Sequence, residues 1–348
     1  MKTFTLKPLA MLTAIGLAAC AATPMNDSAV TAEAKPSVDL ASMDNSVKPC
    51  ADFFQYSNGT WIKNNPIPAD RTSWGAFNEL RDRNLTALNQ VAMAAAFNPT
   101  PDQNSKLVGD FYMSAMDTAK IEAAGVTPLQ AEFARIEALK NSSDLIDVIA
   151  GQHVRGVNAG FNFYVGQDAT DSTQTIAVLG QGGLGLPDRD YYFNEDQKSK
   201  DLRVSYVSHV KKMFVLLGDA PDAAEKNAQS KGIGLAQPGS FNLAQPKFFK
   251  ALAGEMNSTS VADWKTYLRW HTIKENSPKL SKAFTDENFD FYNKTLNGQK
   301  EQLPRWKRMV QVTDTALPEA MGKLYVEKNF AGPAKQRTLD LVKNLLDR

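Results

Sequence analysis

PCADFFQYSNGTWIKNNPIPADRTSWGAFNELRDRN, residues 49–84, is the part of the sequence that is most informative about the fold. Its aromatic side chains lie around two turn-forming clusters, SNG at 57–59 and NPIP at 65–68. Asn and Gly favour turns, so the pattern predicts a short helix over residues 51–56 that ends at the first cluster. Each proline keeps the residue before it extended, which predicts an extended segment next. Thr72 or Ser73 is then expected to cap a second helix.

The same stretch resembles the start of the mature domain in the neprilysin family of zinc metallopeptidases. That family shows an acidic residue, Val, a basic residue, Pro-Cys, Asp-Phe-aromatic, Gly, Trp, Ile-Pro and then aromatic-Gly-x-Phe. The matching residues are Val47, Lys48, Pro49, Cys50, Asp52, Phe53, Phe54, Tyr56, Gly59, Trp61, Ile67, Pro68, Trp74, Gly75 and Phe77. Further similar blocks are DFYMSAMD at 110–117, GLPDRDYY at 185–192 and PRWKR at 304–308. The resemblance therefore covers most of residues 47–348.

Hydrophobic periodicity predicts a mainly α fold. Apolar residues recur at helical spacing in a single helix over residues 104–125 and in further helices up to residue 154. The period then changes at 161–165 and 175–179, which are β-rich and separated by Asp, Thr and Ser, so a hairpin is expected. Helical patterns return after residue 200. The resemblance adds that this multi-helical chain is the N-terminal region of a two-lobed peptidase whose cavity admits only peptides.

The first residues have the features of an exported lipoprotein. Residues 1–19 combine basic Lys2 and Lys7 with a short apolar run, which is typical of a signal peptide. Leu17-Ala18-Ala19-Cys20 resembles a lipobox, which predicts cleavage before Cys20 and a membrane anchor on its thiol. The alternative is an ordinary cleaved signal with an incidental cysteine. Ala21 resembles lipoproteins sent to the outer membrane, so the cell envelope is expected, and residues 20–46 are expected to form a disordered tether.

Composition excludes some functions. The 348 residues carry a formal net charge of +1 and no Lys/Arg run, so nothing favours a nucleic-acid partner. Cys50 is the one cysteine left after Cys20, and with no histidine near it in sequence it is expected to be a free, buried thiol and not a nucleophile.

Glycines at 180, 182 and 185 formally spell G-x-G-x-x-G. A dinucleotide site needs a helix to begin at the last glycine, and Pro187 and Asp188 follow here, so that interpretation is rejected. The next charges, Asp188, Arg189 and Asp190, fit either an acid/base cluster or a structural ion network. The network is favoured because an arginine between two carboxylates can fix a turn.

The chain lacks the motif for zinc proteolysis. Such enzymes place two histidines one helical turn apart with a glutamate between them, whereas His153, His209 and His271 are far apart in sequence. His271 and Glu275 share a helical spacing but have no third ligand. The histidines are expected to be solvated or capping, and no catalytic or metal-binding residue is assigned to this chain. The resemblance implies that zinc belongs to the complete enzyme, in a C-terminal half where a glutamate activates the zinc-bound water.

Two residues are candidates for substrate binding. Relatives that release dipeptides carry an arginine immediately before the aromatic-Gly-x-Phe helix, where it clamps the terminal carboxylate of the substrate. Ser73 stands at that position here, with Arg71 two residues earlier. Either Arg71 substitutes as a bidentate donor or the clamp is absent, and absence is favoured.

The resemblance has a gap. A longer helical run is normal for the family after residue 217, so an internal deletion near 225–238 is expected. Two hypotheses follow. The chain is the N-terminal portion of an exported, lipid-anchored zinc metalloendopeptidase that cleaves peptides. Alternatively, it is a non-catalytic, truncated lipoprotein that acts as a peptide-binding or decayed module.

Overall fold

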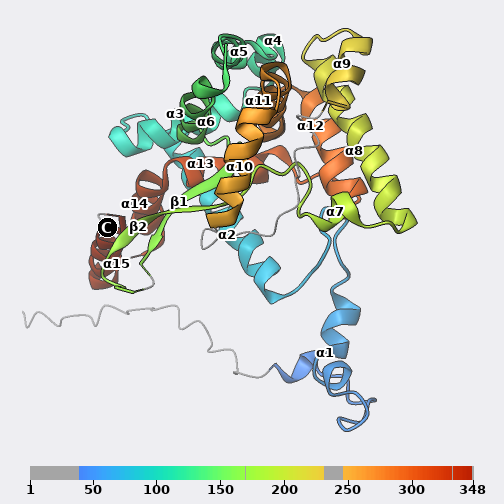
Figure 1. Cartoon of the computed structure of the whole chain (residues 1–348). Coiled ribbons are helices and arrows are strands. Elements are labelled where there is room, and N and C mark those ends of the chain that lie inside the picture. The colour runs from blue at the N-terminus through green and yellow to red at the C-terminus, as the bar shows by residue number, and fades with distance from the viewer. Residues whose placement is uncertain (1–38, 169, 231–245, 331, 347–348) are drawn as a thin grey trace, which may run out of the picture. The chain divides into compact units, whose positions relative to one another are not determined.

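The computed structural model describes residues 39–168, 170–230, 246–330 and 332–346 (Figure 1). The predicted signal peptide, Cys20, most of the predicted tether and part of the expected deletion lie outside these residues. The described residues fall into two compact units, which divide between Pro66 and Ile67. The α-helices and strands are α1 Phe53–Asn64, α2 Ala76–Ala96, α3 Gln103–Met116, α4 Thr118–Ala124, α5 Gln130–Glu137, α6 Leu145–Val154, β1 Phe161–Gln167, β2 Thr175–Gln181, α7 Asp190–Phe193, α8 Gln197–Leu216, α9 Pro221–Ala228, α10 Pro246–Ser258, α11 Val261–Asn276, α12 Lys282–Asn288, α13 Arg305–Ala316, α14 Pro318–Asn329 and α15 Gly332–Leu346.

Helix α1, in the first unit, does not stop where expected. It starts after Asp52, whose carboxylate accepts a hydrogen bond from the Gln55 amide at 2.8 Å, and it runs through Asn58-Gly59 to Asn64. Gly59 is needed for packing, because a Cβ there would lie 2.8 Å from the Cβ of Asp44. The Asp44 amide donates to the Tyr56 carbonyl at 2.8 Å, so the ordered unit begins before Val47.

The expected cap of the second helix is also wrong. Helix α2 begins after Gly75, which is extended and gives no side-chain cap, whereas Thr72 or Ser73 was expected. The predicted helix at residue 104 is likewise divided, since Asp117 ends α3 and its side chain caps α4 through the Lys120 amide at 3.1 Å. Cys50 is exposed, which corrects the expectation of a buried thiol.

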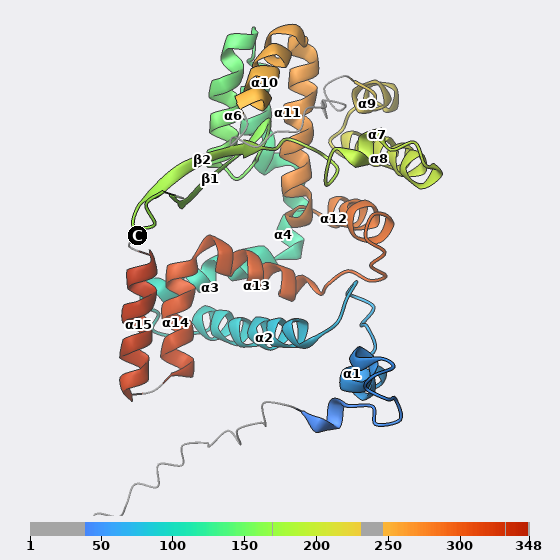
Figure 2. The ribbon, with the colours of Figure 1, turned by 60° about the horizontal axis from the view of Figure 1, so that its bottom comes forward.

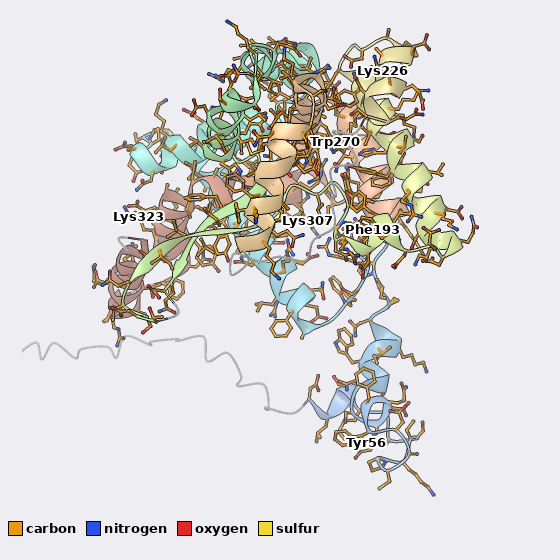
Figure 3. The ribbon with its side chains drawn as sticks, viewed as in Figure 1. Tyr56, Phe193, Lys226, Trp270, Lys307 and Lys323 are labelled. Carbon is orange, nitrogen blue, oxygen red and sulfur yellow. The ribbon has the colours of Figure 1, made fainter. Side chains whose placement is uncertain are left out.

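Three hydrophobic clusters hold the second unit together. One joins α2, α3, α13 and α14, and another joins α5, α6 and α11. The third packs α8, α9 and α12 against α11 and the π-helical segment η5, Phe289–Thr295. Trp270 of α11, labelled in Figure 3, is 1% exposed. Its ring meets that of Tyr206 edge to face at a centroid distance of 6.0 Å. Helix α11 therefore serves two clusters, with different residues turned to each.

The sheet of the described residues has two antiparallel strands, with Phe163 opposite Leu179 and Val165 opposite Ala177. Figure 2 shows this hairpin extending away from the helices at its base. The prediction of a mainly α fold with one small hairpin is confirmed. Among the described residues, no helix combines the length and apolar character needed to cross a bilayer.

Candidate functional site

The glycine-rich loop after β2, residues 182–187, is built around tyrosine hydroxyls. A Cβ on Gly183 would lie 2.4 Å from the Tyr267 hydroxyl, and one on Gly185 would lie 1.8 Å from the Tyr206 hydroxyl. Gly183 also has φ +81°, a conformation that favours glycine. These glycines let backbone approach aromatic side chains closely. That physical role accounts for the G-x-G-x-x-G spacing without a nucleotide.

Three tyrosines fix the backbone of this loop by hydrogen bonds. The Tyr267 hydroxyl accepts from the Gly160 amide at 2.8 Å and donates to the Gly183 carbonyl at 2.9 Å. The Tyr292 hydroxyl donates to the Gly185 carbonyl at 2.8 Å, and the Tyr192 hydroxyl accepts from the Gly185 amide at 3.0 Å. Burial raises the pKa of each of these tyrosines, so they remain protonated.

The loop forms one wall of a groove of about 900 Å³. On another wall, the Lys274 ammonium donates to the Leu184 carbonyl at 3.4 Å and pairs with Glu275 at 3.1 Å. The lining residues are Asn158, Asn162, residues 181–190, Lys274, Glu275, Tyr292, Leu296 and Asn297. Amides and charges of this kind can hold a polar ligand. None of the described lining residues is a Ser, Thr, Cys or His, so the groove lacks the usual nucleophile–base pair.

The three charges after the loop take different partners. Asp188 accepts a hydrogen bond from the Asp190 amide at 2.8 Å, which fixes the turn into α7. The Arg189 guanidinium lies 3.3 Å from the Asp190 carboxylate and 5.0 Å from the centroid of the Phe193 ring. The contacts are those of a turn at a helix start, with the Arg189 and Asp190 side chains largely exposed.

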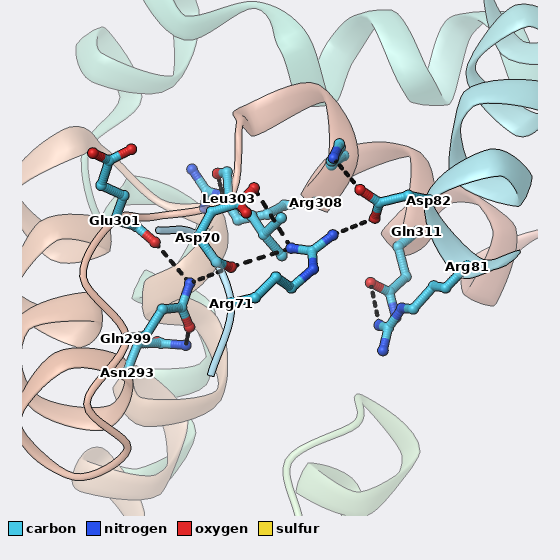
Figure 4. Close-up of polar contacts among 11 residues, drawn as sticks. Asp70, Arg71, Arg81, Asp82, Asn293, Gln299, Glu301, Leu303, Arg308 and Gln311 are labelled. Atoms are coloured by element: carbon cyan, nitrogen blue, oxygen red, sulfur yellow. Dashed lines mark hydrogen bonds and ion pairs between the residues drawn. The ribbon is translucent and has the colours of Figure 1, made fainter. Parts of the chain in front are cut away.

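Arg71 is held in a network of charges, shown in Figure 4. Its side chain is 11% exposed, pairs closely with Asp82 of α2, and lies 3.6 Å from the Asp70 carboxylate. The other Asp82 oxygen lies 2.7 Å from the Lys307 ammonium of α13. Burial raises the pKa of Asp82, but hydrogen bonds from Lys307 and Arg71 outweigh it and hold that pKa below its usual value.

The segment around Arg71 is also fixed by its backbone. The Ala69 carbonyl accepts a hydrogen bond from the Lys300 amide at 3.1 Å. In Figure 4 the Asp70 carbonyl accepts one from the Gln299 side chain at 3.1 Å. Ser73, the other candidate, is exposed two residues beyond Arg71. Arg71 and Ser73 therefore differ in the structure. The Arg71 guanidinium is paired with Asp82, whereas Ser73 is exposed.

The expectation that the histidines are solvated or capping is wrong for two of the three, which are buried inside α8 and α11. His209 is 2% exposed and shares a hydrogen bond of 3.0 Å with Glu287, while His271 is 1% exposed beside Tyr267. Burial lowers the pKa of His271 to about 3, with a further contribution from Lys274. His153, which is partly buried, shares a 3.0 Å hydrogen bond with the Ala159 carbonyl. Within the described ranges, no three His, Cys, Asp or Glu side chains group as metal ligands.

Sequence reasoning missed Tyr267, Tyr292 and Lys274, which lie at least 80 residues beyond the loop that they hold. No local motif marks them. The glycine spacing was the available signal, because it indicates that something approaches the backbone closely without saying what.

The mainly helical fold and the GLPDRDYY loop agree with the resemblance to the N-terminal region of a peptidase. The profile of Peptidase family M13 matches residues 49–235 and 229–348, and the chain belongs to this family. Endothelin-converting enzyme 1 of Homo sapiens is 26% identical over 96% of this chain and 52% of that protein. The Mycobacterium tuberculosis zinc metalloprotease ZMP1, solved with an inhibitor, is 30% identical with a TM-score of 0.75, over 89% of this chain and 54% of that chain.

Another solved structure, PEPO from Lactobacillus rhamnosis, shares 16% identity and a TM-score of 0.67, and shows the fold alone. The chain spans about half the length of the relatives that it matches. The resemblance to a zinc metallopeptidase family, drawn from the sequence motifs, is confirmed.

Proposed function

We propose that this chain is the N-terminal portion of an exported zinc metalloendopeptidase that cleaves peptides. One observation carries the proposal: the family profile spans residues 49–348, yet the chain covers only 54% of a solved zinc metalloprotease of the same fold. The described residues do not fit a zinc ion, because they offer no group of three suitable ligands. The ligands are therefore assigned to the part of the relatives that this chain does not cover.

Peptides are the proposed substrates, and endopeptidase cleavage is the proposed mode. A carboxylate clamp for dipeptide release needs a free guanidinium, but Arg71 is 11% exposed and bound to Asp82. Ser73 stands at the clamp position and carries no charge, and the Arg71 guanidinium is already paired. Neither candidate residue therefore offers a free cation to the terminal carboxylate of a substrate. This arrangement supports cleavage inside a peptide.

The experiment that tests the proposed function is to sequence the encoding gene beyond the codon for Arg348. A reading frame that continues through an H-E-x-x-H helix supports the peptidase. A stop codon directly after Arg348 overturns it in favour of a non-catalytic, peptide-binding or decayed lipoprotein.

We further propose that Cys20 carries a lipid anchor at the bacterial cell envelope, on the outer membrane. The supporting observation is the Leu17-Ala18-Ala19-Cys20 pattern after a short apolar run. Cells fed radiolabelled palmitate are expected to label the full chain, and Cys20→Ser is expected to abolish the label, with Cys50→Ser as the matched control. Equal labelling of Cys20→Ser and wild type would contradict the anchor.

A further inference from the structure

The groove beside the glycine-rich loop has a second wall of unusual backbone. This wall is η5, the π-helical segment Phe289–Thr295, together with the residues that follow it. The Leu296 amide donates to the Phe291 carbonyl at 2.9 Å, five residues back, as a π-helix requires. The Asn297 side-chain amide donates to the next carbonyl, that of Tyr292, at 2.7 Å. Because π-helical turns occur frequently at functional sites, this wall marks the groove as a candidate binding site.

Both walls of the groove are held in place by the fold. The Tyr292 hydroxyl donates to the Gly185 carbonyl at 2.8 Å, which ties η5 to the loop. Phe291, which does not line the groove, stacks on buried His209 at a centroid distance of 4.7 Å and an interplanar angle of 11°. A ligand that enters a preformed groove does not have to order its walls, so less binding free energy is lost.

Amide side chains are the commonest polar groups of the groove. An amide side chain donates and accepts hydrogen bonds, as the main chain of a peptide does. Asn158 is exposed, and its side chain makes no hydrogen bond within the described residues. The groove can therefore pair with an extended main chain. The four lining amides are Asn158, Asn162, Gln181 and Asn297.

The charges of the groove leave one carboxylate without a cation. Lys274 pairs with Glu275 at 3.1 Å, and Arg189 pairs with Asp190 at 3.3 Å. The carboxylate of Asp188 accepts the Asp190 amide at 2.8 Å but pairs with no cation of the described residues. Three carboxylates against two cations disfavour a ligand that carries phosphate. They do not group as metal ligands either, so the unpaired carboxylate suits a basic side chain.

We propose that this groove binds an extended peptide segment that carries a Lys or Arg side chain. The lining amides hydrogen-bond to the peptide main chain, and the Asp188 carboxylate pairs with the basic side chain. Both cations of the groove are already paired, so it takes the interior of a peptide and not its terminal carboxylate. The inference rests on the proposed function, to which it adds a peptide-binding site in this chain and a preferred side chain.

Peptide titrations followed by nuclear magnetic resonance test the inference on the 348-residue chain labelled with ¹⁵N. The probes are acetyl-Ala-Ala-Lys-Ala-Ala-amide and the same peptide with Glu in place of Lys, whose blocked ends carry no charge. The Lys peptide is expected to shift the amides of residues 182–190 and 296–297 with a Kd of about 1 mM or tighter. The Glu peptide is expected to bind at least about fivefold more weakly.

Two pairs of variants separate the readout of charge from that of the main chain. Asp188→Asn keeps an oxygen for the Asp190 amide and removes the charge, so it is expected to weaken the Lys peptide by about threefold to fivefold and to remove the preference over the Glu peptide. Asp147→Asn, at an exposed carboxylate of α6, is its control and is expected to change neither affinity.

Asn158→Ala is expected to weaken both peptides by the same factor, because it removes a group that pairs with the main chain. Its control is Asn257→Ala, at an exposed amide of α10, which is expected to leave both affinities unchanged. A change in the ratio of the two affinities cannot come from partial unfolding, since unfolding lowers both together.

Three results overturn the inference. The first is the absence of saturable shifts in the groove up to about 10 mM Lys peptide. The second is equal affinity of wild type for the Lys and Glu peptides. The third is a glycan as occupant, seen when a trimer of N-acetylglucosamine shifts the groove amides and the Lys peptide does not.

The reading frame of the gene separates this inference from the proposed function. Binding of the Lys peptide in the groove of a chain that stops after Arg348 retains the inference and counts against the peptidase. No binding in the groove, in a chain whose frame continues through an H-E-x-x-H helix, retains the peptidase and overturns the inference.

Discussion

At the scale of the residue, His271 makes stability depend on pH. Burial lowers its pKa to about 3 in the fold, from the ordinary histidine value of 6.5 that holds in the unfolded chain. Below about pH 6.5 the imidazole therefore binds a proton in the unfolded chain but not in the folded chain. The free energy of unfolding that His271 contributes is present above that pH and is lost as the pH falls. We expect the titration of His271 to lower the free energy of unfolding by about 2 kcal/mol when the pH falls from about 7.5 to about 5. Burial also lowers the pKa of His209, which acts in the same direction despite Glu287.

Urea unfolding at both pH values measures this loss. His271→Gln removes the titrating group, so its stability is expected to change with pH by about 2 kcal/mol less than that of wild type. His153→Gln, at a partly buried histidine, serves as the control. An unchanged pH slope in His271→Gln would show that the imidazole is not held neutral by burial.

Gly185 is a second residue whose effect can be measured. Its Cβ would lie 1.8 Å from the Tyr206 hydroxyl, and Tyr206 is 4% exposed, so the ring cannot turn away into solvent. Gly185→Ala is expected to lower the free energy of unfolding by about 1–3 kcal/mol through overpacking. Gly254→Ala in α10, with nothing within 4 Å of the added atom, is expected to be neutral or slightly stabilising. Thermal melts of the two variants compare them, and equal melting temperatures would contradict the close approach.

At the scale of the element, Asp82 couples α2 to α13. It faces Arg71 and Lys307, whose side chains are 11% and 16% exposed. In Asp82→Asn, Lys307 loses this carboxylate, and Arg71 keeps only the Asp70 carboxylate, which lies 3.6 Å away. We expect a loss of about 1–3 kcal/mol, less than for a fully buried pair because the Asp82 side chain is 26% exposed. Asp110→Asn breaks only the exposed Lys106 pair and is expected to cost under about 0.5 kcal/mol in the same denaturant titration. Equal stability of Asp82→Asn and wild type would show that the two helices are held by apolar packing alone.

The same elements show how far sequence reasoning reaches. The hairpin and most helices could be predicted, because their hydrophobic periods are local signals. The start of α3 was placed at residue 104, whereas Asp102 caps the helix. The continuation of α1 beyond Asn58-Gly59 could not be predicted, because it depends on the close approach of Asp44 to Gly59. The burial of His209 and His271 could not be predicted either, because it also depends on residues that are distant in sequence. Glu287 and Gly183, which they meet, are distant in sequence.

At the scale of the whole molecule, the question is which part of an M13 peptidase holds the metal. Protein zinc sites use at least three side-chain ligands at about 2.0–2.3 Å. In this chain His209 is hydrogen-bonded to Glu287 and stacked on Phe291 at 4.7 Å, and the described residues form no ligand group. Purified 348-residue chain is therefore expected to bind less than about 0.1 zinc per chain by plasma emission spectrometry after dialysis.

One zinc in the chain alone would contradict the prediction and would require either ligands outside the described residues or a rearrangement of the described ones. His271→Gln and His209→Gln then decide where such a metal sits. Zinc that survives both substitutions cannot use the two buried histidines, whereas its loss in either would mean that this imidazole leaves its buried position to bind the ion.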